Sequence, residues 1–359
     1  MQLKWTQFFW RQLLRLRRKA HLLDYFFWEA TLRCNLACRH CGSDCLKDPR
    51  TSDLSADRVI GVFRNIAERY FPSLVMVAVM GGEPLVRPDL FEILAEVQRF
   101  GFPWGLVTNG MLVDEHIVQK CQSTGMKTVS VSIDGTSTFH NAFRGHPESY
   151  ERAEQAVRLF VASRAFQVVD VITCANAENL DHLENLGHHL HALGVQSWRL
   201  FTIFPKGRAT TAPHLIASSS ILRRTFSLIE QMRNIYPGWA VSYSEEGYLG
   251  PAWELKVRDI PHYCGAGINI GGLLADGSYS ACPSLSREWI QGHVDELPFM
   301  EAWDRRYRNM RSRDWMKNDS CGECAEWKNC QGSSLHLWDW KRHCPAVCHL
   351  KLLNEPGSC

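Results

Sequence analysis

The sequence predicts an α/β protein whose parallel strands curve into a barrel, followed by a cysteine-rich tail. Strand-like and helix-like segments alternate about six times between residues 25 and 204. This alternation suits a doubly wound sheet or a barrel, because both place helices between parallel strands. Unusual residues at or just past the strand ends favour the barrel, where those ends converge on one mouth. They are Cys34, Gly81, Thr108, Ser132, Thr173 and Phe204.

The elements follow from apolar periodicity and from turn residues along the chain. Residues 74–80 form a continuous apolar run that ends in two glycines, as expected for a parallel strand buried on both faces. We expect the other strands at residues 25–31, 104–108, 128–133, 166–173 and 197–204. We expect helices at residues 52–70, 88–100, 113–124, 148–164, 179–193 and 218–235. A connection containing Pro, Gly and Trp then runs to about residue 258, where we place a domain boundary.

Composition narrows the classes of function. The chain has 359 residues and a formal net charge of +2, so no overall field points to nucleic acid. It has 14 cysteines, yet the first twenty residues lack the apolar core and cleavage site of a secretory signal. We therefore expect a cytoplasmic protein whose clustered thiols bind metal rather than form disulfides. No apolar run approaches the length that spans a bilayer.

The first 23 residues are predicted to form a basic amphipathic helix. Lys4, Arg11, Arg15 and Arg18 share one narrow face at helical spacing, and aromatic and aliphatic residues cover much of the rest. Such a helix can lie on an anionic membrane surface or bind an acidic partner. We favour a helix that caps the core with its aromatic face, because the apolar face is too broad for a clean surface binder.

Three thiols stand close together directly after the first strand. Cys34, Cys38 and Cys41 are separated by three and then two residues. Zinc sites usually take four ligands in separated pairs, so this trio fits zinc poorly. A [4Fe–4S] cluster normally takes four thiolates, so three would leave one iron open to a small molecule.

This cysteine loop resembles that of radical S-adenosylmethionine (SAM) enzymes, and Gly81-Gly82-Glu83-Pro84 resembles their "GGEP" motif. The resemblance implies a partial (β/α)6 TIM-like barrel with a [4Fe–4S] cluster on Cys34, Cys38 and Cys41. It also implies that SAM binds the open iron and is cleaved to a 5′-deoxyadenosyl radical. The motifs that would bind SAM are Gly81, Gly82 and Glu83 at its ammonium group, Thr108-Asn109, Ser132 and Asp134 in Ser-Ile-Asp-Gly, and Arg144 at its carboxylate.

The tail resembles the SPASM or "twitch" extension of this superfamily. Cys264, Gly277 and Cys282 match its opening half, with the glycine turning a hairpin, and Cys321, Cys324 and Cys330 match its second half. The full pattern expects a cysteine where this chain has Ser334. The remaining alternative is zinc, which also favours a Cys-x2-Cys pair.

The resemblance implies one or two auxiliary clusters in the tail. One would use Cys321, Cys324, Cys330 and Cys348, and a second would use Cys264 and Cys282 with Cys344 or a non-cysteine ligand. Cys45, Cys121, Cys174 and Cys359 are expected to be ordinary thiols. Sulfatase-maturing members carry an aspartate where this chain has Pro283, so that activity is disfavoured.

The sequence thus predicts a radical SAM oxidoreductase that modifies a peptide or small protein. Over nearly the whole chain it resembles a radical SAM/SPASM group paired with small lipoproteins, which makes a lipoprotein or its precursor a candidate substrate. A flavodoxin or ferredoxin would supply electrons. The alternatives are modification of a tetrapyrrole side chain in a haem pathway, and a zinc-stapled interaction module without catalysis. We expect four regions: the basic helix (1–23), the radical SAM barrel (24–215), a helical linker (216–258) and the SPASM/twitch domain (259–355).

Overall fold

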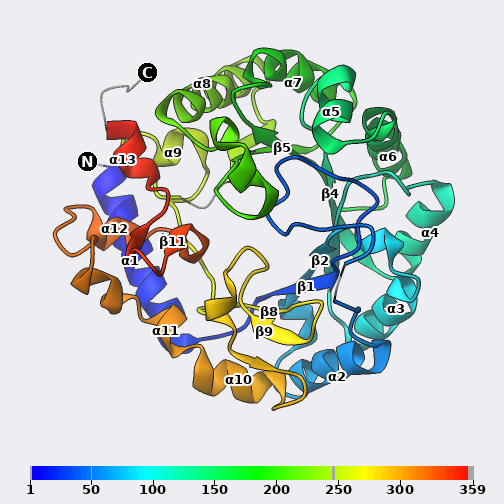
Figure 1. The fold of residues 1–359 in the computed structure, drawn as a ribbon, viewed down its shortest axis with the longest axis horizontal. Coiled ribbons are helices and arrows are strands. Elements are labelled where there is room, and N and C mark those ends of the chain that lie inside the picture. Colours follow the sequence, from blue (N-terminus) through cyan, green and yellow to red (C-terminus); the bar gives the residue numbers. More distant parts are fainter. Residues whose placement is uncertain (1, 50, 245–246, 355–359) are drawn as a thin grey trace.

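A ring of helices surrounds a curved, mainly parallel sheet in the computed structural model, which describes residues 2–49, 51–244 and 247–354 (Figure 1). Seven strands follow one another in sequence and in space, and each is parallel to the next. They are β1 (Tyr25–Thr31), β2 (Met76–Gly81), β3 (Trp104–Thr108), β4 (Met126–Ser132), β5 (Val168–Ala175), β6 (Ser197–Thr202) and β7 (Ala240–Tyr243). The predicted α/β barrel is therefore confirmed.

The helices between these strands form the outer ring (Figure 1). Three of them begin with a side-chain cap, since the side chains of Asp114, Thr136 and Ser218 accept hydrogen bonds from the first turns of α4, α5 and α8. The bounds are α2 (Ala56–Ala67), α3 (Leu90–Phe100), α4 (Glu115–Ser123), α5 (Ser137–Arg144), α6 (Ser149–Ser163), α7 (Leu183–Ala192) and α8 (Ser219–Ile235). Apolar side chains from these helices and from the outer face of the strands form the main core, with Trp28, Trp104 and Trp198 among the largest fully buried residues.

The tail extends the same sheet at its other edge. Strand β8 (Ile270–Leu273) lies parallel to β1, and β9 (Ser278–Ser280) and β10 (Gly292–His293) continue antiparallel. The predicted hairpin around Gly277 is therefore present, between β8 and β9. The remaining elements are α9 (Glu254–Val257), α10 (Phe299–Arg306), α11 (Arg308–Arg311), α12 (Trp327–Cys330), β11 (Trp338–Asp339), β12 (Cys344–Pro345) and α13 (His349–Asn354).

Two observations bear on the expected regions. Residues 216–258 contain α8 and β7, and β7 pairs with β6, so this segment adds to the barrel sheet. The boundary at residue 258 stays a prediction. Helix α1 (Gln2–Ala20) lies against the tail, where Trp10 donates to the carbonyl of His262 (3.4 Å) and Arg11 to Asn329 (3.4 Å).

The orientation of α1 differs from the expected one. Leu14 is buried, whereas Phe8, Phe9, Leu13 and Leu16 are exposed. The helix therefore docks by the side that carries Trp10 and Leu14, and much of its aromatic face points to solvent. None of the described helices is long and apolar enough to cross a membrane.

Candidate functional site

The cysteine loop sits at the carboxyl end of β1 and is fixed by backbone hydrogen bonds. Cys34 N–H donates to the carbonyl of Leu46 (2.8 Å), while Ala37 and Arg39 donate to the carbonyls of Arg144 and Phe143 at the end of α5. Those two carbonyls are at the end of a helix, where the backbone lacks partners within the helix. The loop is thereby closed at its base by Leu46 and held against the end of α5.

The three thiols of this loop lie close enough to influence one another. Burial raises the pKa of Cys34 to about 11, and Cys38 and Cys41 raise it further as neighbouring negative charges. Burial also raises the pKa of Cys38. Cys41 differs, since a hydrogen bond from the Cys45 thiol lowers its pKa to about 6. Buried thiolates that repel one another need a metal to compensate their charge.

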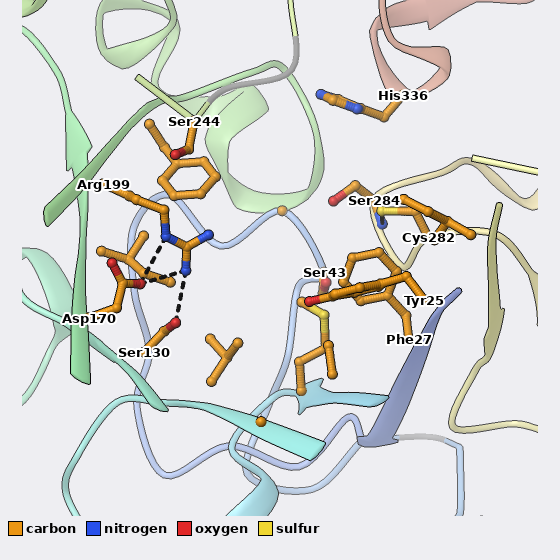
Figure 2. A pocket seen from close by; sticks show the side chains of 18 of the residues that line it. Tyr25, Phe27, Ser43, Ser130, Asp170, Arg199, Ser244, Cys282, Ser284 and His336 are labelled. Atoms are coloured by element: carbon orange, nitrogen blue, oxygen red, sulfur yellow. Dashed lines mark hydrogen bonds and ion pairs between the residues drawn. The ribbon is translucent and has the colours of Figure 1, made fainter. Parts of the chain in front are cut away.

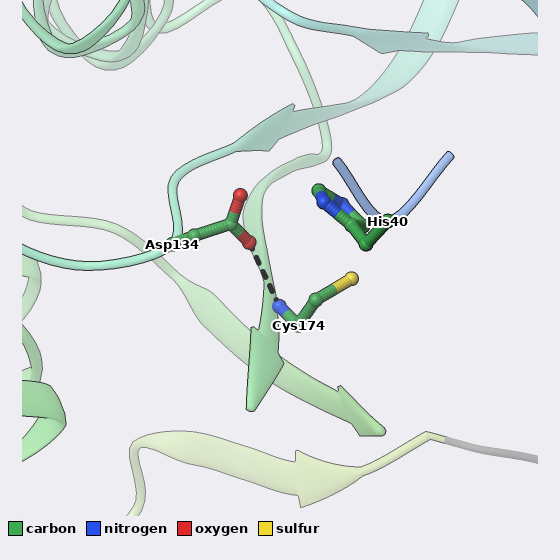
Figure 3. A group of neighbouring side chains, drawn as sticks. All are labelled: His40, Asp134 and Cys174. Carbon is green, nitrogen blue, oxygen red and sulfur yellow. Dashed lines mark hydrogen bonds between the residues drawn. The ribbon is translucent and has the colours of Figure 1, made fainter. Parts of the chain in front are cut away.

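The three loop sulfurs are not spaced for a single ion. Among the described residues, the group of three metal-binding side-chain atoms that lies within 4.8 Å is His40, Asp134 and Cys174 (Figure 3). Sulfurs bound to one zinc at about 2.3 Å would stand only about 4 Å apart. A four-iron cluster takes each thiolate on a different iron and so spaces them more widely. The sulfurs of Cys34, Cys38 and Cys41 do not form so compact a group within the described residues, and their binding of a cluster stays a prediction.

The two glycines after β2 allow that strand to meet the cysteine loop. Gly82 N–H donates to the carbonyl of Thr31 (2.8 Å), and Glu83 N–H donates to that of Arg33 (2.9 Å). A Cβ atom at Gly81 or Gly82 would overlap those same carbonyls. The glycines thus serve the close approach of two backbones, in addition to any contact with a ligand.

Glu83 connects the ends of β2 and β3 beneath the loop. Its carboxylate accepts hydrogen bonds from Thr108 Oγ1 (2.9 Å) and from the backbone N–H of Asn109 (2.7 Å). Full burial raises its pKa to about 7, and these donors act in the opposite direction. Asn109 in turn donates to Asn35 Oδ1 (2.7 Å), inside the cysteine loop. Glu83, Thr108 and Asn109 are therefore brought together as expected, and they also position the loop.

Arg144 and Asp134 form a buried ion pair at the end of β4. Arg144 Nε donates to Asp134 Oδ2 (2.8 Å). Burial alone would raise the pKa of Asp134, but the guanidinium lowers it to about 2. No hydrogen bond within the described residues uses the two terminal nitrogens of Arg144, which leaves two parallel donors for a carboxylate. Ser132, half-buried, ends β4 two residues before Asp134.

The ring of His40 lies beside this ion pair, close to Asp134 and Cys174 (Figure 3). The ring stacks on Phe143, with centroids 4.3 Å apart. Burial lowers the pKa of His40 to about 4, so the ring is neutral near pH 7. A cation here would lie beside the guanidinium of Arg144, which makes a separate metal site unfavourable.

Sequence reasoning missed the segment that braces the cysteine loop from the far side of the barrel. Arg208, in a short helix after β6, donates through Nε to the carbonyl of Cys38 (2.8 Å) and through Nη1 to that of Cys45 (2.9 Å). Its backbone N–H donates to the carbonyl of Cys41 (3.0 Å). Gly207 has φ +55°, and a Cβ there would overlap the same carbonyl. The sequence signal that could have indicated this contact is Gly207-Arg208, which follows shortly after the end of β6.

A cavity of about 970 Å³ fills the barrel below the loop (Figure 2). His40, Cys41, Gly42 and Ser43 are among its lining residues, so the cavity reaches the cysteine loop. Its walls are mostly apolar and include Tyr25, Phe27, Met76, Met80, Ile172 and Phe201. Three cations and two carboxylates also line it: Arg17, Arg199, Lys206, Asp24 and Asp170.

In the tail, four thiols influence one another. Burial raises the pKa of Cys330, and Cys348, Cys321 and Cys324 add negative charge nearby. The four residues predicted for one auxiliary cluster therefore lie near enough to interact electrostatically, and the cluster itself stays a prediction. Ser334, in place of the expected cysteine, has a buried hydroxyl without a hydrogen-bond partner among the described residues.

The second predicted set is more dispersed. Cys264 is buried, and its carbonyl accepts from Arg313 (2.9 Å). Cys282 lines the barrel cavity, and Cys344 lies in the short strand β12. A second auxiliary cluster stays a prediction. Of the residues expected to be ordinary thiols, Cys121 is buried behind the barrel, and Cys359 lies outside the described residues.

The sequence model of the Radical SAM superfamily matches residues 28–190, from β1 through most of α7. Residues 28–190 of the chain therefore form a radical SAM domain. An AdoMet-dependent heme synthase of Nitratidesulfovibrio vulgaris is 24% identical over 329 residues, which cover 87% of this chain and 87% of that protein. Mycofactocin maturase MftC of Mycobacterium tuberculosis is 26% identical and covers 86% of this chain and 77% of that protein.

The fold is shared with the crystal structure of Streptococcus suis SuiB bound to precursor peptide SuiA. Its TM-score is 0.72 at 15% identity, over 96% of this chain and 80% of SuiB. The protein with the sequence given above is a radical SAM enzyme that uses a [4Fe–4S] cluster and SAM, and its tail is of the SPASM type. The alternative of a zinc-stapled module without catalysis is therefore set aside.

Proposed function

We propose that this radical SAM enzyme modifies a peptide or small protein. In this proposal Cys34, Cys38 and Cys41 bind the catalytic cluster and leave one iron for SAM. When bound, cluster and SAM together supply a 5′-deoxyadenosyl radical that removes a hydrogen atom from the substrate. The SAM site consists of the residues that surround the loop at the strand ends: Gly81, Gly82, Glu83, Thr108, Asn109, Ser132, Asp134 and Arg144.

The residues of this site have separate tasks. Arg144, held by Asp134, presents its terminal nitrogens to the carboxylate of SAM. Glu83 fixes the Asn109 loop beside the cluster, and the neutral ring of His40 offers an apolar face beside the cosubstrate. The barrel walls exclude water from the reacting atoms, which protects a radical from side reactions.

The apolar lining and the paired charges of the cavity support a peptide as the substrate. Its lining is largely apolar, and its charged groups nearly balance. Lys206 already donates to the carbonyls of Pro283 and Leu285 (both 3.0 Å), and Arg199 is paired with Asp170. Tetrapyrroles of the haem pathway carry several carboxylates, and each would need a cation when desolvated. A side chain of a peptide needs none.

The relatives support both classes of substrate. MftC is named a maturase, and the SuiB structure holds a precursor peptide. The heme synthase is similar over as much of the chain, so modification of a tetrapyrrole side chain remains the second candidate. A lipoprotein or its precursor as the peptide, and flavodoxin or ferredoxin as the reductant, are further parts of the proposal. The tail cluster on Cys321, Cys324, Cys330 and Cys348 would relay electrons or position substrate.

An anaerobic titration separates the two candidates. Reconstituted enzyme with SAM and dithionite is mixed either with a peptide from a neighbouring open reading frame or with a porphyrinoid. We expect a mass change in the peptide that depends on SAM, and an unchanged porphyrinoid absorption spectrum. A porphyrinoid that is converted while the peptide stays intact would assign the enzyme to the tetrapyrrole class.

A further inference from the structure

Three polar side chains on neighbouring strands form a row inside the otherwise apolar barrel. Ser130 on β4 and Asp170 on β5 are paired in register, and Arg199 lies on the next strand, β6. Arg199 Nε donates to Asp170 Oδ2 (2.9 Å), and its Nη2 donates to the same oxygen (2.5 Å) and to Ser130 Oγ (2.8 Å) (Figure 2). All three side chains line the cavity.

This row is not satisfied by the protein alone. Nη1 of Arg199 makes no hydrogen bond within the described residues, and Figure 2 shows the guanidinium pointing into the cavity, toward Tyr25. The Arg199 side chain is 36% exposed, whereas that of Asp170 is 5% exposed. Asp170 Oδ1 is buried without a hydrogen-bond partner among the described residues. Asp170 Oδ1 is an acceptor and faces away from solvent, whereas Nη1 of Arg199 is a donor without a partner in the described part of the chain, so the row can donate a hydrogen bond to an acceptor group of a ligand.

The charges of Arg199 and Asp170 indicate which kind of ligand group the row can bind. Burial acts to lower the pKa of Arg199, but Asp170 and Tyr25 beside it raise the pKa overall, so the guanidinium stays charged. Asp170 compensates that charge at hydrogen-bond distance. A second carboxylate at Nη1 would lose its hydration and face Asp170 as a like charge. An uncharged carbonyl oxygen gains the same hydrogen bond without that repulsion.

We propose that Arg199 binds an uncharged carbonyl oxygen of the substrate, such as that of an amide, and disfavours a carboxylate. The proposal rests on the proposed function and deepens it, because amides are the polar groups that peptides supply throughout. Arg199 is three residues below the end of β6, or about 10 Å from the barrel mouth at the rise of a strand. It is therefore a specificity residue that anchors the substrate away from the reacting atom.

The test compares two small probes of equal shape and different charge. Hydrocinnamide carries a phenyl group and an amide, and hydrocinnamate carries a carboxylate in the same place. Calorimetric titration into anaerobic, cluster-loaded enzyme with SAM measures both affinities. We expect the amide to bind about tenfold more tightly, as for one hydrogen bond to a charged donor.

Two variants and a control sharpen the test. Asp170→Asn keeps the size of the side chain but leaves the Arg199 charge uncompensated, so we expect the preference to reverse toward hydrocinnamate. Arg199→Gln removes the cation, and we expect the tenfold preference to disappear. Ser197→Ala alters the residue that pairs with Asp170 in register but removes no hydrogen bond of the row, and we expect the ratio of the unaltered enzyme.

Equal affinities in the unaltered enzyme, a preference for hydrocinnamate, or no binding of either probe would overturn the proposal. An unchanged ratio in Asp170→Asn, with the variant folded by circular dichroism, would overturn it as well. Release of 5′-deoxyadenosine by the same unaltered preparation tests the proposed function separately. Release together with equal probe affinities refutes the role of Arg199 alone.

Discussion

At the scale of single residues, the candidate site depends on charges that are buried in pairs. Arg144 is buried beside Asp134, so neither charge is left without a partner when SAM is absent. Removing one member of such a pair costs several kcal/mol, whereas an exposed pair is worth about 1 kcal/mol or less. A useful variant of Arg144 must therefore keep the charge and change only the shape.

Arg144→Lys meets that condition. The ammonium still compensates Asp134, but it lacks the planar fork that binds a carboxylate through two hydrogen bonds. We expect SAM affinity to fall about tenfold, with iron content unchanged. Equilibrium dialysis of radiolabelled SAM against reconstituted protein measures this. The control is Arg224→Lys. Arg224 lies on α8 and forms an exposed ion pair with Asp181, so this variant should bind SAM normally. Equal affinity in both variants would remove Arg144 from the SAM site.

Sequence reasoning identified Arg144 and Asp134 separately but not their contact, and it missed Arg199 and Asp170 as a pair. Spacing within a motif reports local structure, whereas these pairs form only when strands are aligned in the sheet. A signal was present: Asp170 and Arg199 are charged residues inside apolar strands, where an unpaired charge is rarely buried.

At the scale of elements, the cysteine loop is held by segments that follow three different strands. The end of β2 supplies Gly82, α5 supplies its last carbonyls, and the segment after β6 supplies Gly207 and Arg208. Loops carry function when a rigid scaffold positions them, and here the barrel provides that scaffold. Disturbing the segment after β6 should therefore affect a cluster that is distant in sequence.

Gly207→Ala tests this brace. A residue with a side chain at φ +55° costs about 1 kcal/mol in the backbone, and the new methyl group also collides with the carbonyl of Cys41. We expect less iron and a weaker absorption band of the catalytic cluster after reconstitution. Gly238→Ala is the matched control, since Gly238 has φ +89° but nothing within 4 Å of the added atom. If both variants hold the same iron, the brace does not support the cluster.

Most helices and strands of the barrel were predicted within a few residues of their observed bounds. The elements and pairings that were not predicted have physical reasons. The strand at residues 104–108 was predicted with its observed bounds because its apolar run is flanked by Pro103 and by Asn109-Gly110. Helix α5 and strand β7 were missed; they have only 8 and 4 residues, too few for periodicity to show. The pairing of β8 with β1 joins segments more than 200 residues apart, which no local pattern reports.

At the scale of the whole molecule, the tail and α1 are integral to the barrel. Strand β8 continues the sheet beside β1, and His21, just after α1, contacts the carbonyl of Trp303 in α10 (2.9 Å). Cys282 reaches the barrel cavity from the tail. The tail therefore contributes to the wall of this cavity, and under the proposed function it also binds an auxiliary cluster.

Iron content tests the auxiliary cluster. Cys324→Ser combined with Cys348→Ser removes two of its four proposed ligands, and we expect the loss of about four iron atoms per chain relative to the unaltered enzyme. Cys121→Ser, at a buried thiol outside the predicted sets, is the control. Iron and sulfide analysis after anaerobic reconstitution measures the difference. An unchanged iron count in the double variant would refute the assignment of these thiols.

The central claim is that three sulfurs after β1 hold a cluster on which SAM is cleaved. The most direct measurement is the release of 5′-deoxyadenosine by anaerobically reconstituted enzyme supplied with SAM and dithionite. We predict release by the unaltered enzyme and none by a folded Cys38→Ser variant that keeps its tail iron. Equal release by both proteins, or an unaltered enzyme that binds zinc instead of iron and releases nothing, would contradict the account.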